Sequence, residues 1–241
     1  MKLEADLHMH TIASGHAYST ITEMALAAAG KGLKIIAMTD HGPLLPGGPH
    51  EYHFGNIKVL PEYIHGVRVL KGVESNIIND GSLDLDEERL DMLDFVAAGI
   101  HYDAGYNNRT MEEHTTATIT AIKNPRVRMI THPANLYYPV DLQAVVKAAA
   151  ENNVILEVNA SSFDTHRYGK RGSLEKTVEM CKLAREYKVP LSLNSDAHYY
   201  VDVGNIEPLT QVIKEADLKE KDVINCSAEA VEEFLFQLNL A

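Results

Sequence analysis

The chain has 241 residues, 45% of them hydrophobic, and a formal net charge of −12 at pH 7. This composition can supply a large core, and barrels often reach this length as one unit, so we expect a single domain over residues 1–241. No apolar run approaches the roughly 20 residues that cross a membrane, and the first residues lack the apolar core of a signal peptide. The acidic balance disfavours nucleic acid as a partner, because a phosphate backbone attracts a basic surface.

The two cysteines bear on location. Cys181 and Cys226 form no Cys-x-x-Cys pair, which disfavours a disulfide framework. Together with the lack of secretion and membrane signals, this predicts a cytoplasmic protein. A homo-oligomer is compatible with all of these features.

Short apolar, β-branched runs alternate with helical patterns along most of the chain. Strands are predicted at residues 3–9, 34–39, 67–74, 95–100, 127–131, 154–158 and 191–194. Helices are predicted at residues 22–31, 111–123, 142–152, 174–187, 206–215 and 227–238. Thr20 with Glu23 and Thr110 with Glu113 have the spacing of a capping box at a helix start.

This alternation predicts a parallel α/β sheet, either doubly wound or closed into a barrel. The sequence Asn-Asp-Gly-Ser at residues 79–82 indicates a hairpin turn inserted after the third strand. No Gly-x-Gly-x-x-Gly follows the first strand and no Walker loop is present, which disfavours a nucleotide-binding fold.

The first strand carries a pair of histidines. Because side chains alternate along a strand, we expect His8 and His10 to share one face with Asp6. Two imidazoles on one face can hold a metal ion, whereas the alternative is a solvated, histidine-rich strand. The residues at the ends of the later strands decide between the two.

Side chains that can bind metals stand at the ends of six predicted strands or in the loops after them. They are His8, His10, His16, His41, Glu74, His101, His132, Asp196 and His198. The carboxyl ends of parallel strands meet on one face of the fold, so we expect these side chains to converge there. The alternative, a set of unrelated core or capping residues, requires the same coincidence at every strand.

Imidazole and carboxylate ligands without thiolate suit zinc, and less selectively manganese or iron. A tetrahedral ion takes about four ligands, so nine ligands are too many for one ion. They suffice for two or three ions if a carboxylate bridges two of the ions. The residues alone leave open which ligand belongs to which ion. Three divalent ions beside two carboxylates would carry a positive surplus, which favours a phosphate ester over a neutral amide as substrate.

The motifs Asp-Leu-His-Met-His-Thr, Thr-Asp-His-Gly, Gly-Val-Glu, Gly-Ile-His, Thr-His-Pro and Asn-Ser-Asp-Ala-His come one after another in this order. The ordered series resembles that of the polymerase-and-histidinol-phosphatase (PHP) family. The resemblance runs along nearly the whole chain and is strongest to the compact single-domain bacterial phosphatases of that family.

The resemblance implies a distorted (β/α)7 TIM-like barrel with a trinuclear metal centre, usually zinc. By position, His8, His10, Glu74 and Asp196 would hold the first ion. Glu74 would bridge to a second ion held with His101 and His132. The third ion would be held by His16, His41 and His198. All nine positions match the family pattern.

The resulting hypothesis is a metal-dependent phosphatase that hydrolyses a small phosphomonoester through a metal-bridging hydroxide. Asp196 is the candidate proton acceptor as well as a ligand, although a role as ligand alone fits equally well. Arg167 is the candidate phosphate-binding residue, because a guanidinium fork suits phosphate. Asp40 is a candidate to orient a neighbouring ligand, and His50 and His53 are candidates to line the substrate entrance.

The sequence leaves three alternatives to a phosphomonoesterase. A phosphodiesterase or 3′–5′ exonuclease would suit the family, but the sequence lacks a basic stripe with interleaved aromatic residues. A metal-binding module without turnover is a second alternative. An amide hydrolase would have a similar composition, but its usual carboxylated lysine has no evident candidate.

Overall fold

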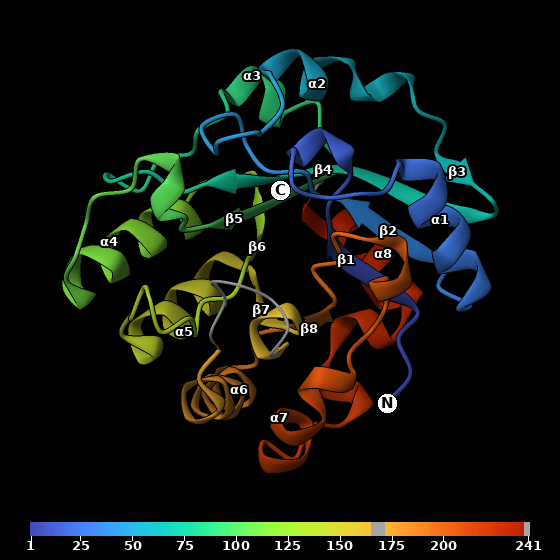
Figure 1. Ribbon diagram of the computed structural model, residues 1–241. Coiled ribbons are helices and arrows are strands. Elements are labelled where there is room, and N and C mark those ends of the chain that lie inside the picture. Colours follow the sequence, from blue (N-terminus) through green and yellow to red (C-terminus); the bar gives the residue numbers. More distant parts are fainter. Residues whose placement is uncertain (165–171, 239–241) are drawn as a thin grey trace.

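A computed structural model describes residues 1–164 and 172–238 of the chain. Seven parallel strands succeed one another around a curved sheet in the order β1-β2-β4-β5-β6-β7-β8 (Figure 1). They are β1 (Ala5–Met9), β2 (Ile35–Met38), β4 (Val67–Asn76), β5 (Phe95–Gly99), β6 (Val127–Ile130), β7 (Ile155–Asn159) and β8 (Leu191–Asn194). All seven predicted strands are present, each within a few residues of its predicted bounds.

The first and last strands meet and close the barrel. Met9 and Ala197 form a parallel bridge, and the His10 amide donates to the Ala197 carbonyl at 2.8 Å. Further down, the Asn225 side chain donates to the Ala5 carbonyl at 3.0 Å and to the Leu193 carbonyl at 2.7 Å. The predicted distorted (β/α)7 barrel is therefore confirmed, with an inserted amide completing the closure between β1 and β8.

Helices surround the strands. They are α1 (Ile21–Gly30), α2 (Glu51–Asn56), α3 (Glu87–Leu90), α4 (Met111–Ile122), α5 (Leu142–Asn152), α6 (Leu174–Tyr187), α7 (Thr210–Glu215) and α8 (Ala228–Leu238). Both predicted capping boxes form, at the starts of α1 and α4. No helix of residues 1–164 and 172–238 is long and apolar enough to cross a membrane.

The last helix blocks one end of the barrel. Val231, Phe234 and Leu235 of α8 pack in the same buried cluster as Leu7 and Leu70, which stand low on β1 and β4. That end is apolar and filled, so the opposite end, where the strands finish, is left for polar side chains.

Three short elements escape sequence prediction. β3 (Tyr63–Ile64) pairs antiparallel with β4, and α2 and α3 each span fewer than two full turns. Such short runs show no measurable hydrophobic periodicity, because they are too short for apolar residues to repeat on one face more than once. The predicted helix at 206–215 begins at Thr210, since a 3₁₀ turn (Glu207–Leu209) containing Pro208 precedes it. The predicted hairpin is present, with a bridge between Ile77 and Leu83.

Candidate metal centre

The structure brings the nine predicted ligands together at the carboxyl ends of the strands. The order of the strands explains the gathering, because each ligand stands at or just after the end of β1, β2, β4, β5, β6 or β8, with His16 in the loop after β1. Burial increases inwards: His8, His10, Glu74 and Asp196 have no exposed surface. His16, in contrast, is exposed, and His101 and His198 are partly exposed.

The expected direction of Asp6 is wrong. Asp6 turns away from the histidines and accepts hydrogen bonds from the Ser195 hydroxyl and, at 2.8 Å, from the Gly204 amide. The pairing of β1 with β2 shifts register between Asp6 and Met9. This irregularity breaks the alternation that the prediction assumed, so His8 and His10 share a side that Asp6 does not.

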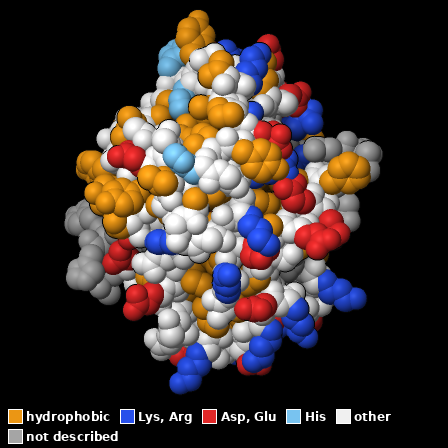
Figure 2. All heavy atoms as spheres, turned by 90° about the vertical axis from the view of Figure 1, so that its right-hand side faces the viewer, with side chains coloured by type: hydrophobic (Ala, Val, Ile, Leu, Met, Phe, Trp, Pro, Cys, Tyr) orange, Lys and Arg blue, Asp and Glu red, His pale blue; other side chains and the backbone are white. Residues whose placement is uncertain are grey.

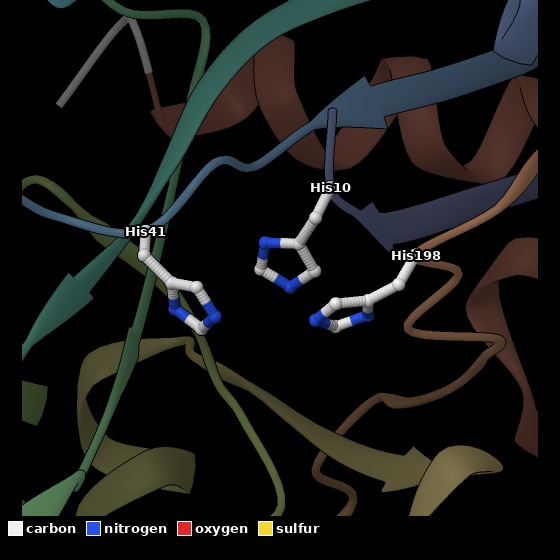
Figure 3. A group of neighbouring side chains, drawn as sticks. All are labelled: His10, His41 and His198. Atoms are coloured by element: carbon white, nitrogen blue, oxygen red, sulfur yellow. The ribbon is translucent and has the colours of Figure 1, made fainter. Parts of the chain in front are cut away.

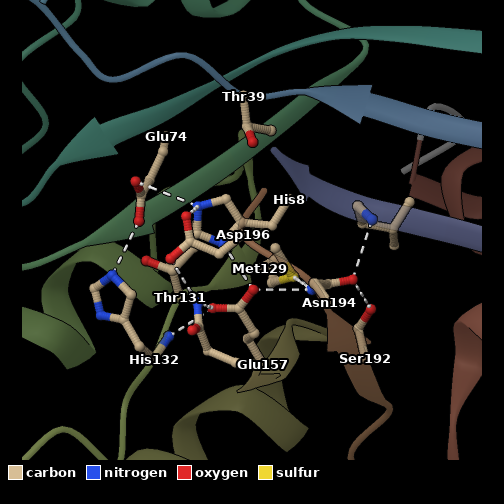
Figure 4. Close-up of polar contacts among 12 residues, drawn as sticks. His8, Thr39, Glu74, Met129, Thr131, His132, Glu157, Ser192, Asn194 and Asp196 are labelled. Atoms are coloured by element: carbon tan, nitrogen blue, oxygen red, sulfur yellow. Dashed lines mark hydrogen bonds and ion pairs between the residues drawn. The ribbon is translucent and has the colours of Figure 1, made fainter. Parts of the chain in front are cut away.

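A first group of four atoms has the dimensions of a metal site, and Figure 4 shows His8, Glu74 and Asp196, which supply three of them. The atoms are His8 Nε2, His10 Nε2, Glu74 Oε2 and Asp196 Oδ1. Five of their mutual separations lie between 3.1 and 3.7 Å. Ligand atoms at about 2.0–2.1 Å from a tetrahedral zinc ion are about 3.3–3.4 Å apart. The four side chains therefore surround a space that fits one ion.

A second group forms on the other oxygen of Glu74. Its Oε1 lies 3.1 Å from His132 Nε2 and 3.6 Å from His101 Nε2. Figure 4 shows the Glu74 carboxylate between His8 on one side and His132 on the other. One carboxylate thus faces two clusters of imidazoles, which is the geometry of a bridging ligand.

A third group consists of His16, His41 and His198. The ring of His16 lies 5.1 Å from that of His41 and 4.8 Å from that of His198, centroid to centroid. Figure 3 shows the rings of His41 and His198 turned towards His10. His41 Nδ1 also lies 2.9 Å from Glu74 Oε2, so this imidazole touches the first group as well as the third.

The buried charges of the centre depend on one another. Burial alone would lower the pKa of His8, but the nearby carboxylates raise this pKa well above its usual value. Burial, and then the neighbouring imidazoles of His41 and His198, hold the pKa of His10 well below its usual value. The Glu74 carboxyl is buried, which opposes ionisation, yet the surrounding imidazoles hold its pKa well below the usual range. His10 and Glu74 are thus shifted towards the neutral imidazole and the ionised carboxylate that metal binding requires, whereas His8 would have to release a proton.

Glu157 supports the first group, and sequence reasoning missed it. Its Oε1 lies 2.7 Å from His8 Nδ1, which turns Nε2 of that ring towards the centre. The same carboxylate accepts from the His132 amide at 2.9 Å and from the side chains of Asn159 and Asn194 at 3.1 and 3.0 Å. The available signal was an acidic residue in the middle of an apolar predicted strand.

Asp84, from the inserted hairpin, supports the second group. Its carboxylate accepts from Asn76 Nδ2 at 2.6 Å, and Oδ1 of the same side chain lies 2.8 Å from His101 Nδ1. It also accepts from the Leu44 amide at 2.9 Å. The loop after β2 approaches so closely that a Cβ on Gly42 would lie 2.2 Å from Asp84 Oδ1. The hairpin thus braces His101 through one amide.

Two of the predicted ligands have unusual backbone conformations. His132 has φ +36° and Asp196 has φ +50°, in the left-handed region that non-glycine residues seldom adopt. Asn159 and the Ser161 hydroxyl donate to Asp196 Oδ2 at 3.1 and 2.9 Å, which directs Oδ1 towards His10. Local strain held by surrounding contacts is typical of functional sites.

The remaining predicted site residues are Asp40, His50, His53 and Arg167, and none of them is among the nine predicted ligands. Asp40 points away from His41 and accepts from the Ser14 hydroxyl at 2.7 Å, and that hydroxyl lies 3.4 Å from His10 Nδ1. His50 caps α2, and His53 lines a separate cavity beside α2 and α3. Arg167 lies outside the described residues, so its role in phosphate binding stays a prediction.

A cavity of about 470 Å³ opens beside the second and third groups. Four of the predicted ligands line it: His16, His41, His101 and His132. Its remaining walls come from the loops after β2, β5 and β6. A small molecule in this cavity would contact the exposed side of the centre.

A seven-stranded (β/α) barrel with imidazoles and carboxylates gathered at its strand ends defines a class of metal-dependent barrel enzymes. Within this class, the chain belongs to the PHP domain family, whose model matches residues 6–161. The family resemblance found in the motifs is confirmed.

Curated relatives carry a common name. A probable phosphatase from Acetivibrio thermocellus is 44% identical over 98% of this chain and 96% of its own length. Another from Thermoanaerobacter sp. is 48% identical over 98% of this chain and 95% of its own length. This name agrees with the predicted enzyme class.

A solved structure shows the same fold. The histidinol phosphate phosphatase of Lactococcus lactis, crystallised with zinc, L-histidinol and phosphate, aligns with a TM-score of 0.62 at 18% identity. The alignment covers 91% of this chain and 95% of that one.

Proposed function

We propose that the protein hydrolyses a small phosphomonoester with three divalent ions, most suitably zinc, with manganese or iron as alternatives. The observation that carries the proposal is the Glu74 carboxylate, whose two oxygens face two separate groups of imidazoles at 3.1–3.6 Å. Carboxylate-bridged ions at roughly 3.5–4 Å are typical of phosphatases and nucleases.

The donor set fits this proposal. His8, His10, Glu74 and Asp196 would hold the first ion, since their spacing matches a tetrahedral shell. His101 and His132 would hold the second with the other oxygen of Glu74. The third would be held by His16, His41 and His198, whose ring centroids lie 4.8–6.2 Å apart.

When bound, such ions supply a hydroxide near neutral pH and neutralise the phosphoryl oxygens. The protein's own side chains orient and buffer that chemistry. Asp196 Oδ1 faces the site while Asn159 and Ser161 hold Oδ2, so the carboxylate is fixed where it could take a proton from the attacking water. Glu157 contacts His8 Nδ1 and so orients Nε2 of that ring towards the site.

Charge supports a phosphate ester as the substrate. Three divalent ions would outweigh the carboxylates of Glu74, Asp196 and Glu157, and the surplus favours an anionic ligand. On the face drawn in Figure 2, Lys and Arg side chains are interspersed with Asp and Glu side chains. The formal net charge of −12 further disfavours a nucleic acid substrate. Arg167 is retained in the proposal as the phosphate-binding cation.

One assay panel tests the proposal. Protein loaded with zinc, manganese or iron is tested on an aryl phosphate, an alkyl phosphate, an aryl phosphodiester and single-stranded DNA. We expect turnover of the monoesters and about three ions per chain by elemental analysis. No monoester turnover with any of the metals would overturn the proposal, and faster turnover of the diester or DNA would replace it.

A substitution tests the proton-accepting role of Asp196. Asp196→Asn keeps an oxygen that can face an ion but removes the basic carboxylate. We expect kcat to fall by about 100-fold in protein with full metal content. Asp164→Asn, which replaces a partly buried carboxylate after β7, is the control for removing one negative charge. Full activity of Asp196→Asn would leave Asp196 as a ligand only.

A further inference from the structure

The cavity beside the metal centre has two chemically different sides. One side consists of the imidazoles of His16, His41, His101 and His132. The other consists of three tyrosines, Tyr102, Tyr137 and Tyr138, with Leu45 and Pro46 from the loop after β2 and the polar side chains of Asp103 and Asn135. A monoester with its phosphate at the imidazoles would therefore place its organic part against rings and apolar side chains.

The tyrosine side is fixed before any substrate binds. The Tyr102 amide donates to the Tyr138 hydroxyl at 3.0 Å, and the Tyr102 hydroxyl donates to the Tyr137 carbonyl at 3.0 Å. The rings of Tyr102 and Tyr138 pack edge to face with centroids 4.5 Å apart. The Arg109 guanidinium lies 4.6 Å from the centroid of Tyr102. A wall held in this way presents aromatic surface in a fixed orientation.

The charge of the same lining is one-sided. Asp103, which is exposed, supplies the carboxylate of this lining. No Lys or Arg lies among the described residues that line the cavity. Burial raises the pKa of Tyr138 to about 12, so this ring stays neutral. Beyond the phosphate itself, a second negative group on the substrate would meet Asp103 and no lysine or arginine among these described lining residues.

Resting on the proposed function, we propose that the substrate is a phosphomonoester whose organic part is a flat apolar ring without a second anionic group. Ring-to-ring packing against the tyrosines would stabilise such a group beyond its buried area. A sugar phosphate would lose water from several hydroxyls against ring carbons, and Asp103 and Asn135 could replace only some of those hydrogen bonds. The specificity-determining residues are Tyr102, Tyr137 and Tyr138 for shape, and Asp103 for charge.

Three esters with the same type of leaving oxygen test the proposal. They are benzyl phosphate, cyclohexylmethyl phosphate, which is similar in size but not flat, and 4-carboxybenzyl phosphate, which adds a distant negative charge. We expect kcat/KM for benzyl phosphate to exceed each of the others by about five- to tenfold. Equal values for all three esters would overturn the inference and leave the proposed function intact, whereas no turnover of any ester would contradict the proposed function itself.

Variants separate shape from charge. Tyr137→Leu removes a half-exposed ring but keeps the backbone carbonyl that Tyr102 contacts. It should lower the ratio of kcat/KM between benzyl and cyclohexylmethyl phosphate about threefold. Tyr63→Leu, at an exposed position on β3, is the matched control and should leave this ratio unchanged. An unchanged ratio in Tyr137→Leu would overturn the role of the aromatic wall.

Asp103→Asn tests the charge. It should raise the ratio of kcat/KM between 4-carboxybenzyl and benzyl phosphate about threefold at low salt, and less at high salt. The control is Asp80→Asn, which removes an exposed carboxylate in the hairpin turn. A ratio that Asp103→Asn does not change would overturn the selection against a second anion.

Discussion

At the residue scale, the centre depends on carboxylates that accept from several donors at once. Glu157 is the clearest case, because its two oxygens accept from two side-chain amides, one backbone amide and one imidazole. Burial opposes its ionisation, but the His8 imidazole holds the pKa of this carboxyl below its usual value. An acceptor with four donors around it cannot be replaced by a group that donates.

We therefore expect Glu157→Gln to weaken the first metal group. The new amide nitrogen must face at least one of the surrounding donors, so the side chain loses its fixed position and His8 loses its orientation. The affinity for zinc, measured by competition with a chelator, should fall about 10–100-fold. Glu151→Gln, exposed on α5, is the control. Unchanged affinity in Glu157→Gln would show that His8 needs no such support.

At the element scale, the hairpin inserted after β4 acts as a brace for the metal centre. Asp84 accepts from the Ser75 hydroxyl at 2.7 Å and from the Asn76 amide at 2.8 Å, in addition to its contacts with the Asn76 side chain and Leu44. It thereby ties the end of β4 to the loop after β2. The two segments carry Glu74 and His41, so their relative position sets the spacing between the groups.

Asp84→Asn should loosen the second group selectively. An asparagine nitrogen would face donors on Asn76 or Leu44, and His101 would lose the fixed amide behind it. In a stepwise zinc titration, we expect one ion per chain to bind about tenfold more weakly while the others bind normally. Asp80→Asn in the same hairpin is the control. Equal weakening of all ions would indicate a general loss of structure instead.

Helix α4 offers a test of stability at the same scale. Glu113 accepts from the Arg109 and Thr110 amides and from the Thr110 hydroxyl, which lowers the pKa of this exposed carboxyl to about 2. Because the pKa is lower in the folded state, the cap stabilises fully above the unfolded pKa of about 4.5 and is lost as the pH falls towards 2.

Glu113→Gln should therefore lower the Tm of metal-free protein at pH 7, and the difference from the parent should shrink between pH 5 and pH 3. The measurement is thermal unfolding followed by circular dichroism with a chelator present. Glu112→Gln removes the same charge from the same turn without touching the cap, so it should lower Tm less at pH 7. A gap between Glu113→Gln and the parent that is constant with pH would contradict the capping account.

At the scale of the whole molecule, the sequence predicted what depends on local pattern. The apolar β-branched runs located all seven parallel strands, and the residues after them located the candidate ligands. Directions that depend on tertiary contacts were not predicted. The irregularity of β1 reversed Asp6, and the support from Glu157 and Asp84 depends on pairing between segments far apart in the chain. Nothing in the sequence around Glu157 or Asp84 indicates which distant residues they contact.

The ligands of the first metal group come from opposite ends of the chain, so a bound ion would also have a structural role. His8 and His10 stand on β1 and Asp196 comes after β8, so the first ion would join the two strands whose meeting closes the barrel. Between these strands the backbone contact at the open end is short, with one parallel bridge at Met9 and Ala197. Ligand bonds from both sides would hold this closure more firmly than the bridge alone.

Metal removal should therefore act on the closure first. Zinc at 100 times its Kd should stabilise the folded state by about 2.7 kcal/mol per site, seen as a higher Tm than in chelator-treated protein. Hydrogen exchange should show where the loss falls. Without metal, we expect faster exchange at the His10 amide, which donates to Ala197, and little change at the Val145 amide at the start of α5. Equal acceleration at both amides would mean that the ions stabilise the barrel as a whole and leave its closure to the side-chain hydrogen bonds of Asn225, Asn194 and Asp6.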